Sequence, residues 1–350
     1  MDFFFGFKKK KMTINIGING FGRIGRFVFR SVMERKTMKV VAINEPFMSI
    51  DNMIYLLKYD SVHGTFPYGS IQKEKGGFSV DNCFVRVFTE KDPRHILWGS
   101  VDVKYVCEST GVFTSTEKAK LHFEGGAKKV ILSAPPSDDT KMLVMGVNHT
   151  EYDDQTMHII SNASCTTNCL APLVKILEKE FGIEEGLMTT VHAMTANQLT
   201  VDGPPRGGKD WRAGRCASQN IIPASTGAAK AVGKVIPELS GKLTGMAFRV
   251  PTPNVSVVDL TVKLKTPQAY SDIINVISNY KNSSLRGIID LCYDPVVSQD
   301  FVDNPHSCIV DVNSGLALND TFFKFVCWYD NEWGYSNRLV DMIHYMETKV

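Results

Sequence analysis

The feature that most constrains this chain is a glycine-rich turn that joins a short strand to a helix near residue 20. Apolar residues alternate with smaller or polar ones over 14–18, and a Gly-x-Gly-x-x-Gly turn follows at 20–25. Apolar residues then recur at helical spacing over 24–32. The run at 39–43 is short and almost continuously apolar, as expected of a strand in a parallel sheet covered on both faces. This strand–turn–helix–strand order predicts a βαβ unit that binds a dinucleotide.

The glycines and a later carboxylate give this unit a specific chemistry. Gly20 permits the tight turn, Gly22 lets the backbone approach a pyrophosphate, and Gly25 allows the helix to pack closely on the strand. The N–H groups of the helix N-terminus then face the phosphates, and Arg23 either contacts them or is a solvated charge. Glu45 ends the second strand, where a carboxylate accepts hydrogen bonds from a ribose diol and repels a 2′-phosphate. We therefore expect NAD rather than NADP as the cofactor.

The chain of 350 residues is long enough for about two domains, and its pattern changes near residue 162. Before that point, strand-like runs at 84–88, 103–107 and 130–132 alternate with helical stretches such as 115–123. This alternation predicts an α/β fold with a Rossmann-type, doubly wound dinucleotide-binding domain.

The second half has the pattern of an α+β domain with a largely antiparallel sheet. A strong helix signal covers 166–181, and a Gly/Pro-rich segment covers 202–214. An alternating run at 255–262 is typical of a half-buried antiparallel sheet, and the stretch 337–346 is again helical.

Composition and charge exclude several classes of protein. With 43% hydrophobic and 22% charged residues, the chain is neither disordered nor of low complexity. The 39 basic and 37 acidic residues give a net charge of +2, too small to indicate a polyanion binder. No apolar run reaches the roughly 18 residues that span a bilayer. The eight cysteines show no CxxC pair or finger-like spacing, so we expect no metal site.

The first 11 residues form an N-terminal extension in which phenylalanines precede a lysine run at 8–11, the reverse of a secretory signal. An upstream start codon or an expression scar before Met12 is the leading interpretation, with weak contact to a membrane surface as the alternative. Without a signal, we expect a cytoplasmic protein with reduced cysteines.

A reactive cysteine marks the start of the second half. Cys165 stands at the N-terminal mouth of the 166–181 helix, where the helix dipole and free N–H groups favour a thiolate and can hold a developing oxyanion. Most of the other cysteines are better explained as small buried hydrophobes. His192 ends a strand-like run and is a candidate base for a Cys165 nucleophile. The sequence alone leaves open whether the two side chains touch.

Four segments of the chain resemble the glyceraldehyde-3-phosphate dehydrogenase family in its phosphorylating form. They are Gly17–Gly25, Ser161–Pro172, Asn220–Lys230 and Trp328–Glu332, and the similarity runs in order from about Thr13 to the C-terminus. The resemblance implies an NAD-linked homotetramer that converts glyceraldehyde 3-phosphate and inorganic phosphate to 1,3-bisphosphoglycerate in glycolysis. We accordingly expect residues 12–162 and 332–350 to form the NAD-binding domain, and residues 163–331 to form the catalytic and oligomerisation domain.

The resemblance also assigns roles to the residues that match the family's motifs. Cys165 matches the nucleophile and His192 its base. The site for the substrate phosphate matches Thr195 and Arg249, and the site for inorganic phosphate matches Ser164, Thr166, Thr226 and Gly227. The cofactor contacts match Arg23, Ile24, Glu45, Lys91, Ser133 and Asn331, beside the three glycines Gly20, Gly22 and Gly25. Arg249 is the most telling of these residues, because a charge inside the apolar run 245–250 needs an anion partner.

The chain departs from the family pattern at several positions. Glu45 and Lys91 stand where Asp and Arg are frequent, which keeps the charge but changes the reach of each side chain. Asn197 and Leu199 replace the frequent Thr and Lys in the loop 193–218, which corresponds to a loop that reaches a neighbouring subunit's cofactor. These departures leave cofactor affinity and the subunit contact open, but not the catalytic pair.

Two other interpretations are compatible with the sequence. One keeps the fold and the nucleophile but acts on erythrose 4-phosphate, or oxidises its substrate without phosphate. The residues that match two anion sites favour the phosphorylating reaction instead. The other is a non-catalytic nucleotide- or RNA-binding protein, since family members are reported to bind RNA in the dinucleotide cleft. The small net charge and the intact Cys165–His192 pair make nucleic-acid binding secondary.

Overall fold

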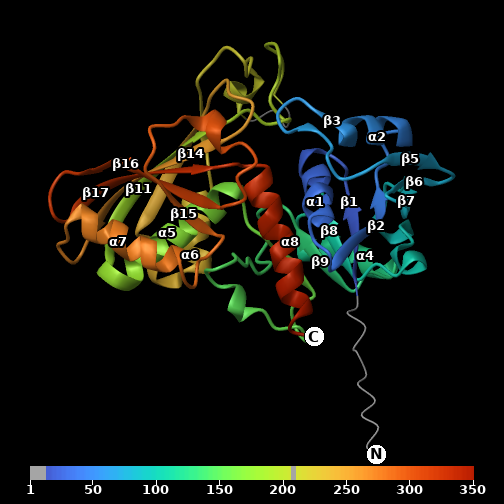
Figure 1. The fold of residues 1–350 in the computed structure, drawn as a ribbon, viewed down its shortest axis with the longest axis horizontal. Helices are drawn as coiled ribbons and strands as arrows, with labels where there is room; N and C mark the ends of the chain where they lie inside the picture. The colour runs from blue at the N-terminus through green and yellow to red at the C-terminus, as the bar shows by residue number, and fades with distance from the viewer. Residues whose placement is uncertain (1–12, 206–209) are drawn as a thin grey trace, which may run out of the picture.

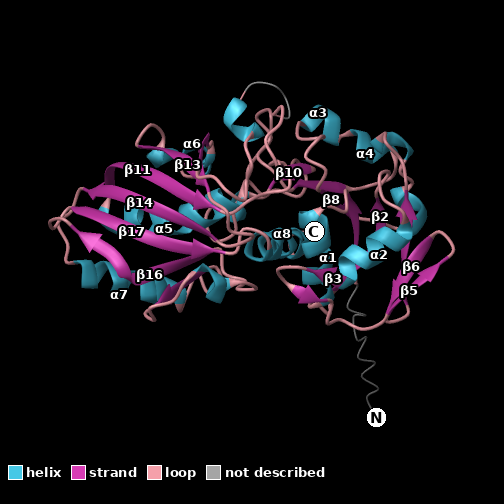
Figure 2. Ribbon diagram, turned by 90° about the horizontal axis from the view of Figure 1, so that it is seen from above, coloured by secondary structure: helices cyan, strands magenta, loops and turns pink. Residues whose placement is uncertain are grey.

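The computed structural model describes residues 13–205 and 210–350. The expected extension 1–11 therefore lies outside the described residues, as does part of the Gly/Pro-rich segment 202–214. Figure 1 shows two sheets with their helices side by side, and helix α8 (Trp333–Glu347) runs between them. The view from above in Figure 2 gives the same arrangement.

The first sheet has eight strands in the order β10-β9-β8-β1-β2-β7-β6-β5. Its strands from β10 to β7 pair in parallel, and the edge made by β7, β6 and β5 is antiparallel. Their bounds are β1 (Ile14–Asn19), β2 (Met38–Asn44), β5 (Ile71–Glu74), β6 (Gly77–Val80), β7 (Cys83–Phe88), β8 (Tyr105–Glu108), β9 (Lys129–Leu132) and β10 (Ile159–Ser161). Because β1 lies between β2 and β8, the winding reverses at β1, and a ligand cleft is expected at the carboxyl ends of these strands.

Helices and short connections complete the first half. They are α1 (Arg23–Met33), α2 (Ile50–Lys58), α3 (Thr116–Ala119) and α4 (Leu121–Glu124), with the two-residue strands β3 (Tyr59–Asp60) and β4 (Gly64–Thr65). The strands predicted at 84–88, 103–107 and 130–132 correspond to β7, β8 and β9. Strand β8 begins two residues later than predicted, because the Val103 N–H closes a turn on the Trp98 carbonyl. The helix predicted at 115–123 is two short helices, α3 and α4, separated at Lys120.

The second sheet has seven strands in the order β12-β13-β11-β14-β17-β16-β15 and is largely antiparallel, with β11–β13 and β15–β16 parallel. Its strands are β11 (Ile183–His192), β12 (Ile222–Ser225), β13 (Leu243–Arg249), β14 (Ser256–Leu264), β15 (Ile289–Cys292), β16 (Cys308–Ala317) and β17 (Phe322–Tyr329). Its helices are α5 (Cys165–Phe181), α6 (Ala228–Val235) and α7 (Tyr270–Lys281). Side chains of β14 alternate between buried and half-buried positions, as the 255–262 pattern predicts. The predicted fold class is confirmed in both halves.

Short 3₁₀ turns lie in the connections between these elements. They are η1 (Pro93–His95), η2 (Trp98–Val101), η3 (His149–Glu151), η4 (Trp211–Gly214), η5 (Pro237–Leu239) and η6 (Ser298–Phe301).

The C-terminal helix packs against the first half of the chain. Leu339 and Ile343 of α8 share one hydrophobic cluster with Phe29 and Val32 of α1 and with strands β1 and β2. Ser31 of α1 also donates a hydrogen bond of 2.9 Å to Asn337. Residues just before α8 are thereby held beside the glycine-rich turn at the start of α1.

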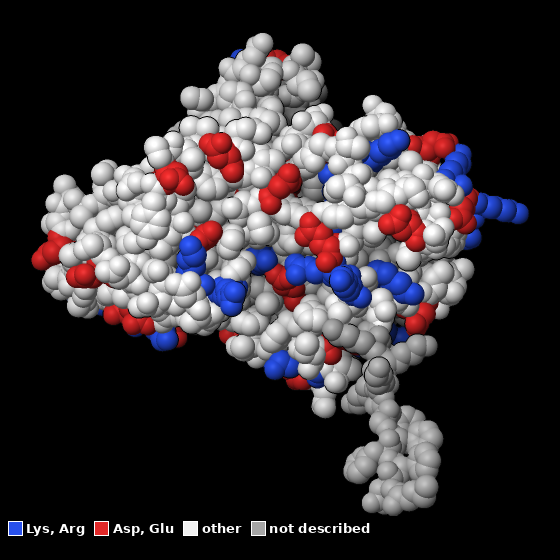
Figure 3. Space-filling view, viewed as in Figure 1, with Lys and Arg blue, Asp and Glu red and all other residues white. Residues whose placement is uncertain are grey.

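Charged side chains of both signs are interspersed on the face shown in Figure 3, which agrees with the net charge of +2. Among the helices that the structure describes, none is both long and apolar enough to cross a membrane.

Candidate active site

A sharp turn between β10 and α5 presents Cys165. The buried Ala163 adopts a left-handed backbone conformation (φ 55°), which is uncommon for a residue other than glycine. Ser161 Oγ accepts a hydrogen bond from its N–H at 3.0 Å. Ser164 then caps α5 by accepting a hydrogen bond from the Thr167 N–H at 3.0 Å. Cys165 follows as the first residue of the helix, as the sequence predicts.

His192 meets Cys165 from the end of the neighbouring strand. Its Nε2 lies 3.5 Å from Cys165 Sγ, so the contact that the sequence left open is present. Its Nδ1 lies 2.8 Å from the carbonyl oxygen of the next residue, Ala193. The parallel register of β11 and β13 places Arg249 directly beside His192, with Nη1 at 2.5 Å from Nδ1. A thiol, an imidazole and a guanidinium therefore lie in a row.

Burial controls the protonation of this pair. Burial, with Arg249 as the second cause, lowers the pKa of His192 from 6.5 to about 4. Burial also raises the pKa of the Cys165 thiol, against the opposing effects of Arg249 and of hydrogen bonds from Thr166. Both directions favour a thiol beside a neutral imidazole, whereas the helix mouth taken alone favours a thiolate. A neutral His192 is able to accept the Cys165 proton.

Tyr329 is a residue of the site to which the sequence analysis gave no role. Its hydroxyl lies 2.9 Å from Thr166 Oγ1 and 2.9 Å from Thr190 Oγ1, and its ring meets His192 edge to face at 6.1 Å. Tyr329 therefore ties the first turn of α5 to strand β11 and holds the imidazole. The one sequence signal was its place in the family-like segment 328–332, which does not reveal these contacts.

A cavity of roughly 350 Å³ is lined by Cys165 and His192 and gathers most of the residues expected at this end of the cleft. These are Arg23, Ile24, Ser133, Ser164, Cys165, His192, Thr195, Arg249 and Asn331. Thr166 lies behind this lining, bonded to Tyr329. Thr226 and Gly227 are not part of the lining; they lie at the N-terminus of α6, where Thr226 Oγ1 accepts the Ala228 N–H at 3.2 Å.

A second cavity, also of roughly 350 Å³, lies at the carboxyl ends of β1 and β2 and collects the other expected cofactor residues. Gly20, Gly22, Glu45 and Lys91 line it, together with Phe47. Ser109 lines both cavities, so the two are neighbouring parts of one cleft.

The glycine-rich turn fits a dinucleotide. Gly20 has φ +89°, and a Cβ on Gly25 would lie only 2.1 Å from the Gly20 carbonyl oxygen, so both positions require glycine. A Cβ on Gly22 would meet nothing within 4 Å, which leaves that side of the backbone open to a pyrophosphate. Gly22 caps α1 without a side-chain hydrogen bond and no acidic residue lies in the first turn, so the helix N-terminus suits phosphate. The glycine roles inferred from the sequence agree with this geometry.

Glu45 holds the backbone of the glycine-rich turn, a role that the sequence does not indicate. Its carboxylate is buried and accepts hydrogen bonds from the backbone N–H groups of Phe21 at 2.9 Å and Phe47 at 3.0 Å. Each oxygen retains a second lone pair for a ribose hydroxyl. Lys91 Nζ lies 5.7 Å from the centre of the Phe47 ring, at the rim of the same cavity. Glu45 therefore also fixes the glycine-rich turn.

Comparison with known proteins places this geometry in a family. Residues 14–116 match the NAD-binding domain of glyceraldehyde 3-phosphate dehydrogenase, and residues 164–331 match the C-terminal domain of the same enzyme. The chain is 58% identical over 347 residues to glyceraldehyde-3-phosphate dehydrogenase 4 of Caenorhabditis elegans, covering 96% of this chain and 98% of that protein. It is 58% identical to the cytosolic enzyme of Chlamydomonas reinhardtii, covering 96% and 97%. The testis-specific enzyme of Mus musculus is 56% identical, covering 97% and 76%. This chain therefore belongs to the glyceraldehyde-3-phosphate dehydrogenase family.

Proposed function

We propose that this protein catalyses the NAD-dependent, phosphorylating oxidation of D-glyceraldehyde 3-phosphate to 1,3-bisphosphoglycerate in glycolysis. The observation that carries the proposal is the row formed by Cys165, His192 and Arg249 at the wall of a cavity that continues into the dinucleotide cleft. A thiol beside a base attacks an aldehyde, and a guanidinium beside them holds an anionic substrate.

The two catalytic side chains account for the chemistry. The Cys165 proton passes through His192 to the aldehyde oxygen as the Sγ–carbon bond forms, which gives a hemithioacetal. His192 then removes the hydroxyl proton while the hydride leaves the same carbon, and a thioester on Cys165 remains. NAD, when bound, supplies the nicotinamide ring that accepts this hydride. An oxygen of inorganic phosphate attacks the thioester carbon, the carbon–sulfur bond breaks, and the Cys165 thiolate takes back a proton from His192.

Two anion sites complete the proposal. Arg249 and Thr195 bind the substrate phosphate, while Ser164, Thr166, Thr226 and Gly227 bind inorganic phosphate. Within the described part of the chain, Arg249 contacts His192 Nδ1, donates a hydrogen bond to the Ala193 carbonyl oxygen and has no carboxylate partner. A half-buried guanidinium without a counter-charge favours a phosphate. The N-terminus of α6 beside Thr226 supports the second site.

The cofactor lies across both cavities in this proposal. Arg23, Ile24, Ser133 and Asn331 would contact its pyrophosphate and nicotinamide side, the turn with Gly20, Gly22 and Gly25 would face the pyrophosphate, and Glu45 and Lys91 would meet the adenosine side. The buried Glu45 carboxylate favours the free diol of NAD over the 2′-phosphate of NADP.

The domains and the assembly follow the same family model. We assign residues 12–162 and 332–350 to the NAD-binding domain and residues 163–331 to a catalytic domain that also forms a homotetramer. Large apolar side chains exposed in this second part support an oligomer: Leu187, Val201, Trp211, Ile221 and Met246. A cytoplasmic location is consistent with the name of the algal relative. Nucleic-acid binding is secondary in this proposal, given the net charge of only +2.

One assay tests the function. NADH formation is followed by absorbance with NAD, glyceraldehyde 3-phosphate and either phosphate, arsenate or neither. The proposal expects sustained turnover only when phosphate or arsenate is present. If erythrose 4-phosphate were the better substrate, the protein would be an erythrose-4-phosphate dehydrogenase instead. If turnover were complete without phosphate, the protein would be a non-phosphorylating dehydrogenase. RNA affinity without turnover would replace it by a binding function.

A further inference from the structure

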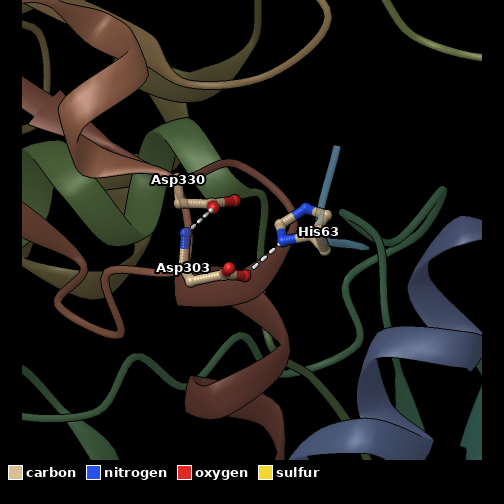
Figure 4. A group of neighbouring side chains, drawn as sticks. All are labelled: His63, Asp303 and Asp330. Atoms are coloured by element: carbon tan, nitrogen blue, oxygen red, sulfur yellow. Dashed lines mark hydrogen bonds and ion pairs between the residues drawn. The ribbon is translucent and has the colours of Figure 1, made fainter. Parts of the chain in front are cut away.

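His63 is a buried histidine outside the catalytic pair. It lies between β3 and β4, and its side chain is only 1% exposed. Its Nδ1 contacts Asp303 Oδ1 at 2.5 Å, and its Nε2 contacts Glu332 Oε2 at 3.0 Å. Figure 4 shows His63 reaching toward Asp303, whose backbone N–H donates in turn to the Asp330 carboxylate at 3.0 Å. Both ring nitrogens thus face carboxylates.

The groups around His63 come from both halves of the chain. From the first half, Phe27 of α1 packs on the imidazole at 4.2 Å between ring centres, and Arg23 and Arg30 flank that phenyl ring. From the second half come Asp303 after η6, Asp330 after β17 and Asn254 before β14. The charged groups around His63 are Arg23, Arg30, Asp60, Asp303, Asp330 and Glu332. Glu34 and Tyr68, which are hydrogen-bonded to each other, line the same cavity as His63 and are the further titratable groups on that side.

An imidazolium suits this cluster better than a metal ion. One atom each of His63, Asp303 and Asp330 lie within 4.8 Å of one another, close enough for a metal. However, the Asp330 oxygens already accept the N–H groups of Asp303, Glu332 and Trp333. Two carboxylates at opposite nitrogens are satisfied when both nitrogens carry a proton. Burial opposes that charge, but the hydrogen bonds to Asp303 and Glu332 outweigh it and raise the pKa of His63 to about 9.

The neighbouring Asn254 is compatible with this protonation. Its Nδ2 lies 3.2 Å from His63 Nε2, and no residue within 13–205 or 210–350 gives its buried Oδ1 a hydrogen bond. A half-turn of the amide gives the Nε2–H a second acceptor.

Glu332 connects His63 to the cofactor cleft. The same carboxylate that contacts His63 pairs with Arg23, whose Nε lies 2.7 Å from Glu332 Oε1. Arg23 also pairs with Asp60, whose Oδ1 accepts the His63 backbone N–H at 3.0 Å. Arg23 and Glu332 both line the cavity that holds Cys165 and Asn331. One hydrogen bond joins His63 to Glu332 and a second joins Glu332 to Arg23, so His63 is linked to two residues that line the proposed cofactor cleft.

We propose that His63, as an imidazolium, is a positioning residue for cofactor binding: it bridges the two halves of the chain and holds Glu332, and with it Arg23, at the cleft. This inference rests on the proposed contact between Arg23 and the cofactor. The carboxylates around His63 outnumber Arg23 and Arg30, and a charged His63 reduces this excess of negative charge by one. When His63 loses its proton, the negative charge beside the proposed pyrophosphate site increases by one, and Glu332 loses a partner. NAD binding weakens as a result, on the order of five-fold for a partly screened charge.

Calorimetric titration of the intact protein with NAD from pH 7 to pH 10 tests the proposal without measuring turnover. The dissociation constant is expected to rise about five-fold between pH 8 and pH 10 in the wild type. In His63→Gln it is raised already at pH 7 and changes little with pH. Asp303 is exposed, and Asp303→Asn removes one of the two carboxylates that favour the charged imidazole. In this variant, the dissociation constant for NAD should therefore begin to rise at a lower pH than in the wild type. The exposed His95, changed to Gln, is the matched control and behaves as the wild type.

The possible outcomes distinguish a failure of the His63 proposal from a failure of the proposal that the cleft binds NAD. Absence of NAD binding at pH 7 in the wild type would contradict the proposed function itself. Tight binding that stays constant from pH 8 to pH 10, or a rise that persists unchanged in His63→Gln, would overturn the role of His63 alone. If His63→Gln does not fold, the Asp303→Asn variant provides the test. A dissociation constant for NAD that rises over the same pH range as in the wild type would then contradict the proposal.

Discussion

The guanidinium of Arg249 lies against Nδ1 of His192, while Nε2 of the same ring faces Cys165. Arg249 Nη1 is 2.5 Å from Nδ1, and Cys165 Sγ is 3.5 Å from Nε2. A cation in this position opposes protonation of the imidazole. A phosphate that pairs with Arg249 neutralises that cation, so we infer that binding of the substrate makes His192 a stronger base where one is needed.

Arg249→Gln should raise the pKa of His192 above about 4, because it removes one of the two causes that lower it and leaves burial in place. The same change should reduce kcat/KM for glyceraldehyde 3-phosphate by about 10²-fold, since charge-assisted hydrogen bonds to phosphate are lost. NMR titration of a labelled imidazole measures the first effect and steady-state kinetics the second. Arg249→Lys retains a charge and should leave the His192 pKa low. An unchanged pKa in Arg249→Gln would contradict the inferred coupling.

Limited alkylation should label Cys165 before the other cysteines, with activity lost in proportion. His192→Asn should slow this labelling near neutral pH and reduce turnover by about 10²–10⁴, the range for a lost general base. Peptide mapping follows the label. Cys83 is the exposed thiol and the natural competitor, so Cys83→Ser is the control and should not alter inactivation. Label on Cys216 or Cys308 while activity persists would rule out Cys165 as the nucleophile.

Glu45→Ala should weaken NAD binding and narrow the ratio of kcat/KM between NAD and NADP. The lost hydrogen bonds to the ribose cost about 1.5–3 kcal/mol, or roughly 10- to 150-fold in affinity. Because Glu45 also accepts the Phe21 N–H, the variant should loosen the glycine-rich turn. Glu45→Gln is the informative partner, since it retains one acceptor oxygen but removes the charge. Equal use of both cofactors by the wild type, or an unchanged ratio in Glu45→Ala, would exclude this account of cofactor choice.

His192 should make the protein less stable in acid. Its pKa in the folded protein, about 4, is lowered from 6.5, so the unfolded chain binds this proton more readily. The stability that the neutral imidazole contributes is therefore complete above pH 6.5 and is lost as the pH falls toward 4. The shift corresponds to roughly 3 kcal/mol in the free energy of unfolding. Denaturant unfolding at several pH values gives the free energy of unfolding of the wild type and of His192→Asn. If the two free energies changed in parallel between pH 6.5 and pH 4, the predicted contribution of His192 would be disproved.

The strands and helices around the cofactor could be predicted because local pattern determines them. The glycines at 20–25 have backbone and packing requirements that few other turns share, and the almost continuously apolar run in β2 indicates a buried parallel strand. The return of α8 to α1 depends on side chains about 300 residues apart, such as Ser31 and Asn337, so no local period reveals it, and the expectation that 332–350 joins the first half rests on the family resemblance.

The site was predictable only in part, for the same reason. Cys165 at the mouth of a helix is a local signal, and it was found. The approach of Arg249 to His192 comes from the parallel register of β11 and β13, and the Tyr329 contacts join residues of α5, β11 and β17. The protonation of the pair depends on burial, which a helix position does not specify.

The most direct test of the central claim is to mix the protein with NAD and glyceraldehyde 3-phosphate in the absence of phosphate and to map the modified peptide by mass spectrometry. The account predicts one equivalent of NADH per subunit and a 3-phosphoglyceroyl thioester on Cys165, which disappears when phosphate is added and yields 1,3-bisphosphoglycerate. A burst of NADH with no acyl group on Cys165, or an acyl group that phosphate does not remove, would contradict it.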